Sequence, residues 1–144
     1  MQIPRIHDLT QAYGIPTICS VGYEADDIIA TLCTRATERG WKVIIVSADK
    51  DLTQLVDNDA KMWDPQKDVV YDEQGVKDKF GIKPSQVIDF MALTGDTSDN
   101  VPGIPGIGPK TAATLIENYQ TLEGIYDHIG EIKQKKVREN LINH

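Results

Sequence analysis

Three short acidic motifs stand out in the sequence, each at a point where a regular element is expected to begin or end. They hold seven of the 22 acidic residues: Glu24, Asp26 and Asp27; Asp49 and Asp51; Asp96 and Asp99. Crowded carboxylates repel one another and raise one another's pKa, and a cation relieves that repulsion. An all-oxygen site favours hard ions such as Mg²⁺ or Mn²⁺ over zinc. The motifs therefore predict a site for hard divalent ions.

The spacing within each motif supports this interpretation. Asp49 and Asp51 are two residues apart, as are Glu24 and Asp26, so each pair points to one side of an extended segment. Asp96 and Asp99 are three apart, a spacing that a helical turn brings to one side. The reaction that needs many carboxylates and two hard ions about 3.5–4 Å apart is phosphodiester hydrolysis. We therefore expect a two-metal phosphodiesterase site.

Each motif also has a simpler interpretation when it is taken alone. An Asp in the first turn of a helix commonly caps it, which would account for Asp26 or Asp27. A single Asp-x-Asp after a strand is commonly a solvated turn. A Gly-Asp-x-x-Asp-Asn segment is commonly a loop with Asx-turns. The presence of all three motifs at the ends of elements makes the shared metal site the favoured interpretation.

The net charge of −7 at first argues against a nucleic-acid ligand. Residues 1–99 carry 10 basic and 17 acidic residues, whereas residues 100–144 carry 5 of each. Without the seven motif residues the chain would be neutral, with 15 acidic against 15 basic residues (22 − 7 = 15). If the motifs hold metal ions, the acidity no longer excludes a polyanionic ligand.

A glycine-rich turn over residues 103–108 leads into a predicted helix. Backbone N–H groups just before a helix N-terminus form a natural phosphate site. The predicted DNA-binding residues are Gly103, Gly106, Ile107, Gly108, Lys110 and Thr111. A contact with the nucleic-acid backbone would carry no sequence preference. The alternative is a plain connection between two helices, with the basic residues near the C-terminus forming a solvated face.

The order of elements predicts an α/β fold: a mostly parallel sheet flanked by helices, then a helical region. We expect helices over residues 2–13, 25–39, 51–56, 72–80, 84–94, 109–119, 122–129 and 132–142, and strands over 16–21, 43–46, 61–63 and 69–71. The Val-Ile-Ile-Val run at 43–46 suits a parallel strand buried on both faces. The expected domains are a partial α/β metal-binding core (1–99) and a helix–turn–helix DNA-binding region (100–144).

Two smaller expectations concern individual side chains and the cellular location. Residues Val87, Ile88, Met91 and Ala92 are predicted to form the apolar face of their helix. Cys19 and Cys33 both lie among apolar residues and are interpreted as reduced core residues. With no signal-peptide layout and no membrane-spanning run, we expect a cytoplasmic protein without a membrane partner.

Three long motifs together resemble a known family, and the resemblance covers nearly the whole chain. They read Gly-Tyr-Glu-Ala-Asp-Asp, Ser-Ala-Asp-Lys-Asp-Leu-Thr-Gln-Leu and Leu-Thr-Gly-Asp-Thr-Ser-Asp-Asn-Val-Pro-Gly-Ile-Pro-Gly-Ile-Gly-Pro-Lys-Thr-Ala. They look like the 5′–3′ exonuclease domain of bacterial DNA polymerase I, in the flap endonuclease superfamily. The resemblance implies a PIN-like 5′-nuclease core and two-metal cleavage of 5′ flaps and nicked duplexes in replication and repair. A polymerase domain in the parent protein is a further implication.

The resemblance also assigns roles to the acidic residues. Glu24 and Asp26 match ligands of the first metal, with Asp27 close by, and Asp49 matches a ligand near both metals. The matched second-metal group consists of Asp51, Asp96 and Asp99. Asp26, Asp49 and Asp51 are the predicted catalytic residues. The glycine turn matches a helix–turn–helix that grips duplex DNA and often holds K⁺ through backbone carbonyls.

The departures from the family pattern shape the expectation for the chain itself. The family's domain starts upstream of the position that matches Met1, with a strand that bears a metal-binding Asp and with a helical arch. We therefore expect a fragment with weak or no cleavage that still binds metal and DNA. The main rival hypothesis is a non-catalytic duplex-DNA-binding module. A receiver-like phosphoryl-transfer domain is a weaker rival, because such a domain would normally end in a strand with a Lys.

Overall fold

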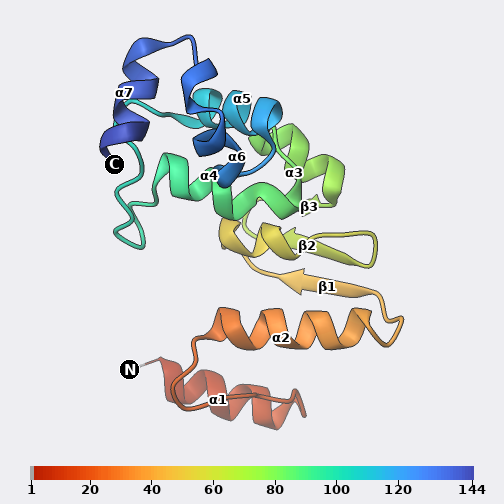
Figure 1. Ribbon diagram of the computed structural model, residues 1–144. Helices are drawn as coiled ribbons and strands as arrows, with labels where there is room; N and C mark the ends of the chain where they lie inside the picture. Colours follow the sequence, from red (N-terminus) through yellow and green to blue (C-terminus); the bar gives the residue numbers. More distant parts are fainter. Residues whose placement is uncertain (1) are drawn as a thin grey trace.

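A small mixed sheet forms the centre of the N-terminal half of the chain. The computed structural model describes residues 2–144. The sheet contains β1 (Val43–Val46), β2 (Ala60–Asp64) and β3 (Val69–Tyr71) in that order (Figure 1). β1 pairs with β2 in parallel, and β2 pairs with β3 antiparallel. The predicted α/β class is confirmed, but the sheet is mixed and not mostly parallel.

The short connection between β2 and β3 explains the antiparallel pair. Four residues separate the two strands, and parallel strands need a much longer crossover. The buried carboxylate of Asp64 accepts hydrogen bonds from the backbone N–H groups of Gln66 and Lys67 at 3.0 and 3.2 Å. Asp68 adopts a left-handed conformation (φ 52°) that completes the reversal. Asp64 therefore serves the turn.

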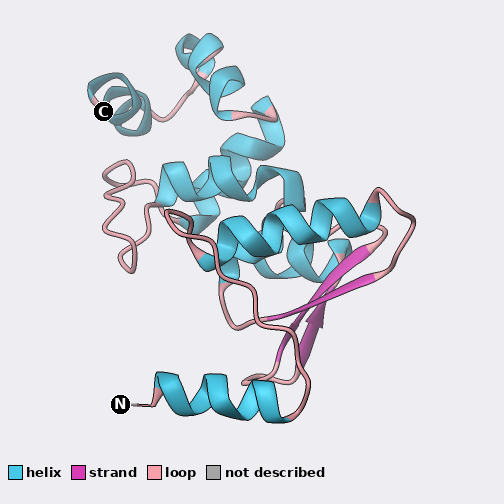
Figure 2. Cartoon of the chain, turned by 90° about the horizontal axis from the view of Figure 1, so that it is seen from below, coloured by secondary structure: helices cyan, strands magenta, loops and turns pink. Residues whose placement is uncertain are grey.

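The helices lie on both sides of this sheet (Figure 1), and Figure 2 shows that they make up much of the chain beside the short strands. They are α1 (Ile3–Ala12), α2 (Ala25–Thr37), α3 (Glu73–Phe80), α4 (Val87–Thr94), α5 (Pro109–Tyr119), α6 (Leu122–Asp127) and α7 (Lys135–Asn143), with short 3₁₀ helices η1 (Lys50–Leu55), η2 (Pro84–Gln86) and η3 (Ile129–Glu131). α2 lies next to β1, and α1 is separated from the sheet by α2 (Figure 1). The helices from α3 onward lie on the other side of the sheet.

Most predicted helices are confirmed, and their ends follow from local chemistry. Asp72 caps α3 by accepting a hydrogen bond from the N–H of Gly75 at 2.9 Å, and Gly81 ends that helix in a left-handed conformation. The apolar face predicted for α4 is partly wrong. Ile88 and Ala92 are exposed, and the buried residues are Val87, Phe90 and Leu93. The predicted face is rotated about the helix axis from the face that is buried. Because almost every residue of this helix is apolar, the sequence pattern does not single out one face.

The predicted strand over residues 16–21 is wrong. This segment has no regular structure and its side chains are exposed. A strand needs a neighbour for its backbone hydrogen bonds, and the only partner of β1 among residues 2–144 is β2. Cys19 lies in this segment and is exposed, which corrects the prediction of a core residue, whereas Cys33 is buried as expected.

Burial is also uneven across the sheet. The prediction that residues 43–46 are buried on both faces is wrong, since Ile44 and Val46 are 58% and 59% exposed and only Ile45 is buried. The hydrophobic core lies on the other face, where it runs from Met62 and Val76 through Leu93 to Ile116 and Leu141. Within residues 2–144, no helix has the length and apolar character that a membrane crossing requires.

Candidate metal centre and nucleic-acid surface

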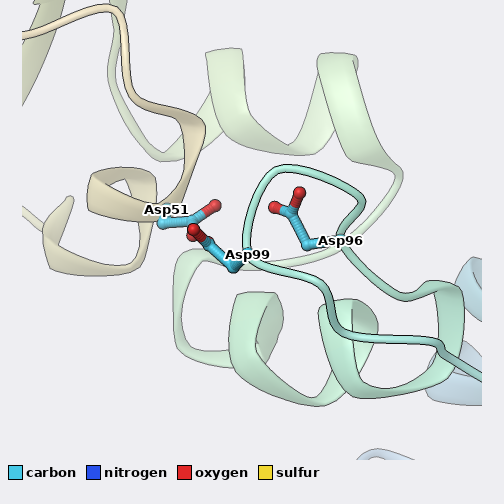
Figure 3. A group of neighbouring side chains, drawn as sticks. All are labelled: Asp51, Asp96 and Asp99. Atoms are coloured by element: carbon cyan, nitrogen blue, oxygen red, sulfur yellow. The ribbon is translucent and has the colours of Figure 1, made fainter.

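Asp51, Asp96 and Asp99 come together at one place in the fold. One carboxylate oxygen from each lies within 4.8 Å of the others, and the three side chains converge from two separate segments (Figure 3). Asp51 lies in the first turn of η1, while Asp96 and Asp99 lie in the loop that follows α4. We call these three residues the acidic cluster. Asp51 precedes Asp96 by 45 positions in the sequence (96 − 51 = 45), so only the fold brings it to Asp96 and Asp99.

A tight turn, and not the expected helical turn, positions two of these residues. Asp96 and Val101 exchange backbone hydrogen bonds of 2.9 and 2.7 Å, which closes the loop. Asp96 Oδ1 accepts the N–H of Ser98 at 2.8 Å, and Asn100 adopts a left-handed conformation (φ 57°). This is the Asx-turn of the simpler interpretation. It nevertheless leaves Asp99 facing Asp51.

Two glycines hold this loop against the backbone that follows it. A Cβ at Gly103 would lie 2.4 Å from the backbone N of Gly95, and a Cβ at Gly95 would lie 2.6 Å from the carbonyl O of Val101. Both glycines have positive φ, at 62° and 75°. The two ends of the loop therefore pack backbone to backbone, at a distance that a side chain would prevent.

Asp49 and Asp51 lie at the start of the 3₁₀ helix η1, and not in the extended segment that their spacing predicted. Asp49 is the N-cap of η1, and its carboxylate accepts the N–H of Asp51 at 3.0 Å. The N–H of Asp49 in turn donates to Ser47 Oγ at 3.0 Å. Because β1 ends at Val46, this motif does lie at the carboxyl end of a parallel strand, where ligands commonly bind.

The first acidic motif begins α2. Glu24 is its extended N-cap residue, whereas Asp26 and Asp27 lie in its first turn, so the expected extended spacing of Glu24 and Asp26 is wrong. Asp27 Oδ2 accepts the N–H of Glu24 at 3.0 Å, which is a capping contact. Loss of solvation raises the pKa of Asp26, and repulsion from Asp49, Asp27 and Asp99 raises it further. Asp26 thus shares an electrostatic environment with the other two motifs.

The members of the acidic cluster differ in their electrostatics. Burial raises the pKa of Asp51 above its ordinary range, and repulsion from Asp49 adds to the shift. A hydrogen bond from Lys50 lowers the pKa of Asp96, and the N–H of Ser98 lowers it further. The Oδ1 atom of Asp51 is buried and has no hydrogen-bond partner among residues 2–144. A buried carboxylate oxygen without a donor is costly in a protein, and a cation would satisfy it.

Lys50 is the functional residue that the sequence interpretation missed. Its Nζ pairs with Asp96 Oδ2 and lies 3.9 Å from Asp51 Oδ1. The hydrogen bond to Asp96 raises the pKa of Lys50, so its ammonium is charged at neutral pH. The sequence feature that could have identified Lys50 is its position between Asp49 and Asp51, where a single positive charge interrupts an acidic motif.

Some of the predicted DNA-binding residues are exposed at the surface, and others hold the turn in place. Gly106, Gly108 and Lys110 are exposed and Thr111 is half-buried at the start of α5, whose N-terminus has no side-chain cap. Ile107 is buried, and its N–H donates to the carbonyl of Ile104 at 3.0 Å. The prediction that Ile107 contacts a ligand is therefore corrected, because this residue anchors the turn in the core.

Gly103 is likewise a supporting residue, through its contact with Gly95. Asn140 of α7 fixes the turn from the opposite side, where its Nδ2 donates to the carbonyl of Pro105 at 2.6 Å. An open groove of about 760 Å³ lies next to the start of α5. The groove is lined by Lys110 and Thr111 of α5, by Lys133 and Gln134 just before α7, and by Glu131, among others. Its two lysines and one glutamate give the lining a net positive charge, which suits an anion.

Two family models together match the whole chain. The model described as the 5′-3′ exonuclease N-terminal resolvase-like domain matches residues 1–81. The model described as the 5′-3′ exonuclease C-terminal SAM fold matches residues 82–144. The two matches meet between residues 81 and 82, in the turn after α3. The functional boundary that the sequence suggested after residue 99 stays a prediction.

The curated relatives carry two kinds of name. DNA polymerase I of Rhizobium leguminosarum is 48% identical over 141 residues, covering 98% of this chain and 14% of that protein. The 5′-3′ exonuclease of Aquifex aeolicus is 45% identical over 125 residues, covering 87% of this chain and 43% of that protein. The chain therefore spans less than half the length of these relatives.

Solved structures share the fold at lower sequence identity. The bacteriophage T5 D15 protein, co-crystallised with metal ions, superimposes with a TM-score of 0.84 at 23% identity, over 96% of this chain and 53% of that one. The catalytic core of Rad2 in complex with DNA superimposes with a TM-score of 0.64 at 23% identity, over 98% of this chain and 48% of that one. The fold and the family matches agree: this chain belongs to the 5′-3′ exonuclease family.

Proposed function

We propose that this chain carries the metal-binding and DNA-anchoring parts of a 5′–3′ exonuclease and flap endonuclease that hydrolyses phosphodiester bonds at 5′ ends and flaps. The observation that carries the proposal is the acidic cluster, in which Asp51 presents a buried oxygen without a partner. The T5 relative was solved as a flap endonuclease complex with DNA and metal ions, which supports the same chemistry here.

The residues present fit hard divalent ions such as Mg²⁺ or Mn²⁺. Asp51, Asp96 and Asp99 would hold the second ion, and their oxygens are the ligands that such ions prefer. Glu24 and Asp26 would contribute to the first ion, and Asp49, whose charge acts on both Asp26 and Asp51, would serve both ions. When bound, such ions lower the pKa of water and stabilise the attacking and leaving oxygens. Asp26, Asp49 and Asp51 are the proposed catalytic residues.

Duplex DNA would be held at the glycine turn and the groove beside α5. Exposed backbone at Gly106 and Gly108, the first-turn N–H groups of α5 and the ammonium of Lys110 suit phosphate oxygens. A K⁺ ion held by backbone carbonyls at this turn is part of the same proposal. The polymerase names of several relatives support attachment to a polymerase domain in the parent protein.

Titration of the chain with Mn²⁺ in a calorimeter tests the metal assignment. Asp99→Asn removes one exposed carboxylate of the acidic cluster, and we expect affinity to fall on the order of tenfold or more because a charged ligand is lost. Asp127→Asn is the matched control, because it removes an equally exposed carboxylate at the end of α6. Equal affinity for the two variants would contradict the assignment.

A labelled 5′-flap duplex with Mg²⁺ or Mn²⁺ tests the reaction. We expect any cleavage by this chain to be weak and to disappear in Asp49→Asn, because the charge of Asp49 acts on both Asp26 and Asp51. Cleavage at an unchanged rate in that variant would refute the catalytic assignment.

A non-catalytic duplex-DNA-binding module is the second candidate, and the groove with Lys110 and Lys133 favours it. In that case Lys110→Ala would weaken binding of a nicked duplex, and Asp99→Asn would leave binding unchanged both with and without metal. A metal-dependent gain in affinity that Asp99→Asn abolishes would favour the nuclease.

A further inference from the structure

Lys50 places a positive charge inside the acidic cluster. It is the first residue of η1, and its Nζ reaches across to Asp96 in the loop after α4. The two segments are joined here by an ion pair between groups 46 positions apart in the sequence. The Asp96 side chain is 5% exposed, whereas the Lys50 side chain is 42% exposed. The pair therefore has one fixed, buried partner and one partner that can reach solvent.

The ammonium of Lys50 neutralises the acidic cluster only in part. Three carboxylates converge there, and one lysine supplies a single positive charge. The distance of 3.9 Å from Nζ to Asp51 Oδ1 is too long for a hydrogen bond, so that buried oxygen keeps no donor. A divalent ion would bring twice the charge and could bind all three carboxylates. Lys50 is thus a partial substitute for such an ion.

An ion and the ammonium cannot occupy the centre of the cluster together. Both would bind the Asp96 carboxylate, and two cations that share one carboxylate repel strongly in a partly buried site. The flexible four-carbon stem of lysine allows the head group to leave by rotation of its side chain. Its exposed fraction shows that solvent is within reach.

We propose that Lys50 is a built-in competitor for the second divalent ion: it holds the loop of Asp96 and Asp99 against η1 in the metal-free protein, and it must leave when the ion binds. This inference rests on the proposed function of the acidic cluster. Lys50 is a positioning residue in this scheme, because it acts through Asp96. Lys50 thus orders the metal-free site. It also lowers the affinity of the site for metal below the affinity that the carboxylates alone would give.

Lys50→Met tests the inference in the full chain, because methionine keeps much of the length of the side chain and removes its charge. We expect Mn²⁺ to bind tighter on the order of tenfold in calorimetry, since the competing cation is gone. The melting temperature in EDTA should fall, and the increase on adding Mn²⁺ should exceed that of the wild type. Lys50→Arg, which keeps the charge, should return the affinity to the wild-type range.

Lys61→Met is the matched control. Lys61 loses the same charge and is similarly exposed (48%), and its ion pair with Asp72 at 3.8 Å lies on the sheet surface. We expect its Mn²⁺ affinity to equal that of the wild type. If both lysine variants bind Mn²⁺ tighter by the same factor, the effect is one of net charge and the inference is wrong.

The remaining outcomes separate this inference from the proposed function. Unchanged or weaker Mn²⁺ binding by Lys50→Met, with normal binding by the wild type, overturns the role of Lys50 and leaves the metal site standing. No Mn²⁺ binding by the wild type overturns the metal site itself. If Lys50→Met does not fold, Lys50→Gln decides by the same criteria, since its amide can still donate to Asp96.

Discussion

α1, near the N-terminus, and α5, in the C-terminal half, are similar amphipathic helices that differ in burial. α1 carries Ile3, Ile6 and Leu9 on one side, yet none of its residues is buried. α5 carries an apolar face of the same kind, and Ala112, Leu115 and Ile116 are buried in the core. A helix gains most of its stability in a protein from packing of its apolar face. The comparison shows that the pattern specifies a helix, while a neighbouring element decides what that helix contributes.

The acidic residues also differ in how well the elements that carry them are packed. Asp96 lies on a loop that follows the buried residues of α4; its side chain accepts hydrogen bonds from Lys50 and from the N–H of Ser98, and its backbone pairs with Val101. Glu24 and Asp26 lie at the start of α2, whose only buried residue is Cys33. The acidic cluster is therefore built on the better packed part of the molecule.

Core truncation should give the largest contrast between the two regions. Ile116→Ala removes a side chain that is 0% exposed and should lower the free energy of unfolding by about 2–5 kcal/mol. Leu9→Ala, at a position that is 57% exposed, should change it by less than about 0.5 kcal/mol. Urea denaturation followed by circular dichroism measures both. A similar loss for the two variants would show that α1 is packed in solution.

Two glycine substitutions should give the next largest contrast. Gly103 and Gly14 have nearly equal positive φ, at 62° and 67°, but a Cβ meets Gly95 N at 2.4 Å in the first and nothing within 4 Å in the second. Gly103→Ala should therefore cost about 1–3 kcal/mol more than Gly14→Ala, because it adds a backbone clash to the same conformational strain. It should also weaken Mn²⁺ binding, since the clash shifts the loop of Asp96 and Asp99. If the two substitutions lower the free energy of unfolding by the same amount, the positive φ alone explains the loss and the backbone clash contributes nothing.

Two neutral substitutions within the acidic cluster should give smaller effects of opposite sign. The folded-state pKa of Asp51 is raised above 3.8, so its contribution favours the fold below that pH and is lost as the pH rises through the raised pKa. Asp51→Asn should then raise the melting temperature of the metal-free protein at pH 7.

The pKa of Asp96 is lowered, so its contribution is present above 3.8 and is lost as the pH falls through the lowered pKa. Asp96→Asn should lower the melting temperature at pH 7.

Melting in EDTA between about pH 3 and pH 7 checks both signs, because the wild type and each variant should converge in the acidic range where the carboxylates are protonated. The opposite directions provide an internal control. If both variants are destabilised at pH 7, Asp51 has a partner in solution that the structure does not show.

Much of the fold followed from the sequence, and the errors share a physical cause. Helices with clear caps were predicted well, since a cap such as Asp72 bonds to a backbone group only three residues away. Residues 16–21 have the composition of a strand, but a strand depends on a partner that composition does not reveal. The exposure of Ile44 and Val46 has the same origin, because burial depends on what covers the sheet.

The candidate site shows a similar division. The residue types in the three motifs were sufficient to predict a cation site, and the resemblance grouped Asp51 with Asp96 and Asp99. The local geometry was not predictable from spacing: the Asp49–Asp51 pair lies at a 3₁₀ helix start, and Asp96 lies in an Asx-turn. Lys50 was overlooked because its partner Asp96 is distant in sequence. Ile107 was misassigned because its burial depends on the helices around it.

The close contact of Gly95 with Gly103 has a consequence for how this segment can vary in length. The loop between them is closed at both ends by backbone packed on backbone, so an inserted or deleted residue cannot be absorbed without moving Asp96 or Asp99. The β2–β3 turn over residues 65–68 is also closed by paired backbone, at Asp64 and Val69, but it carries none of the three carboxylates of the acidic cluster. Among natural variants of this chain, we therefore expect length changes to accumulate in that turn, while the spacing from residue 95 to residue 103 stays constant.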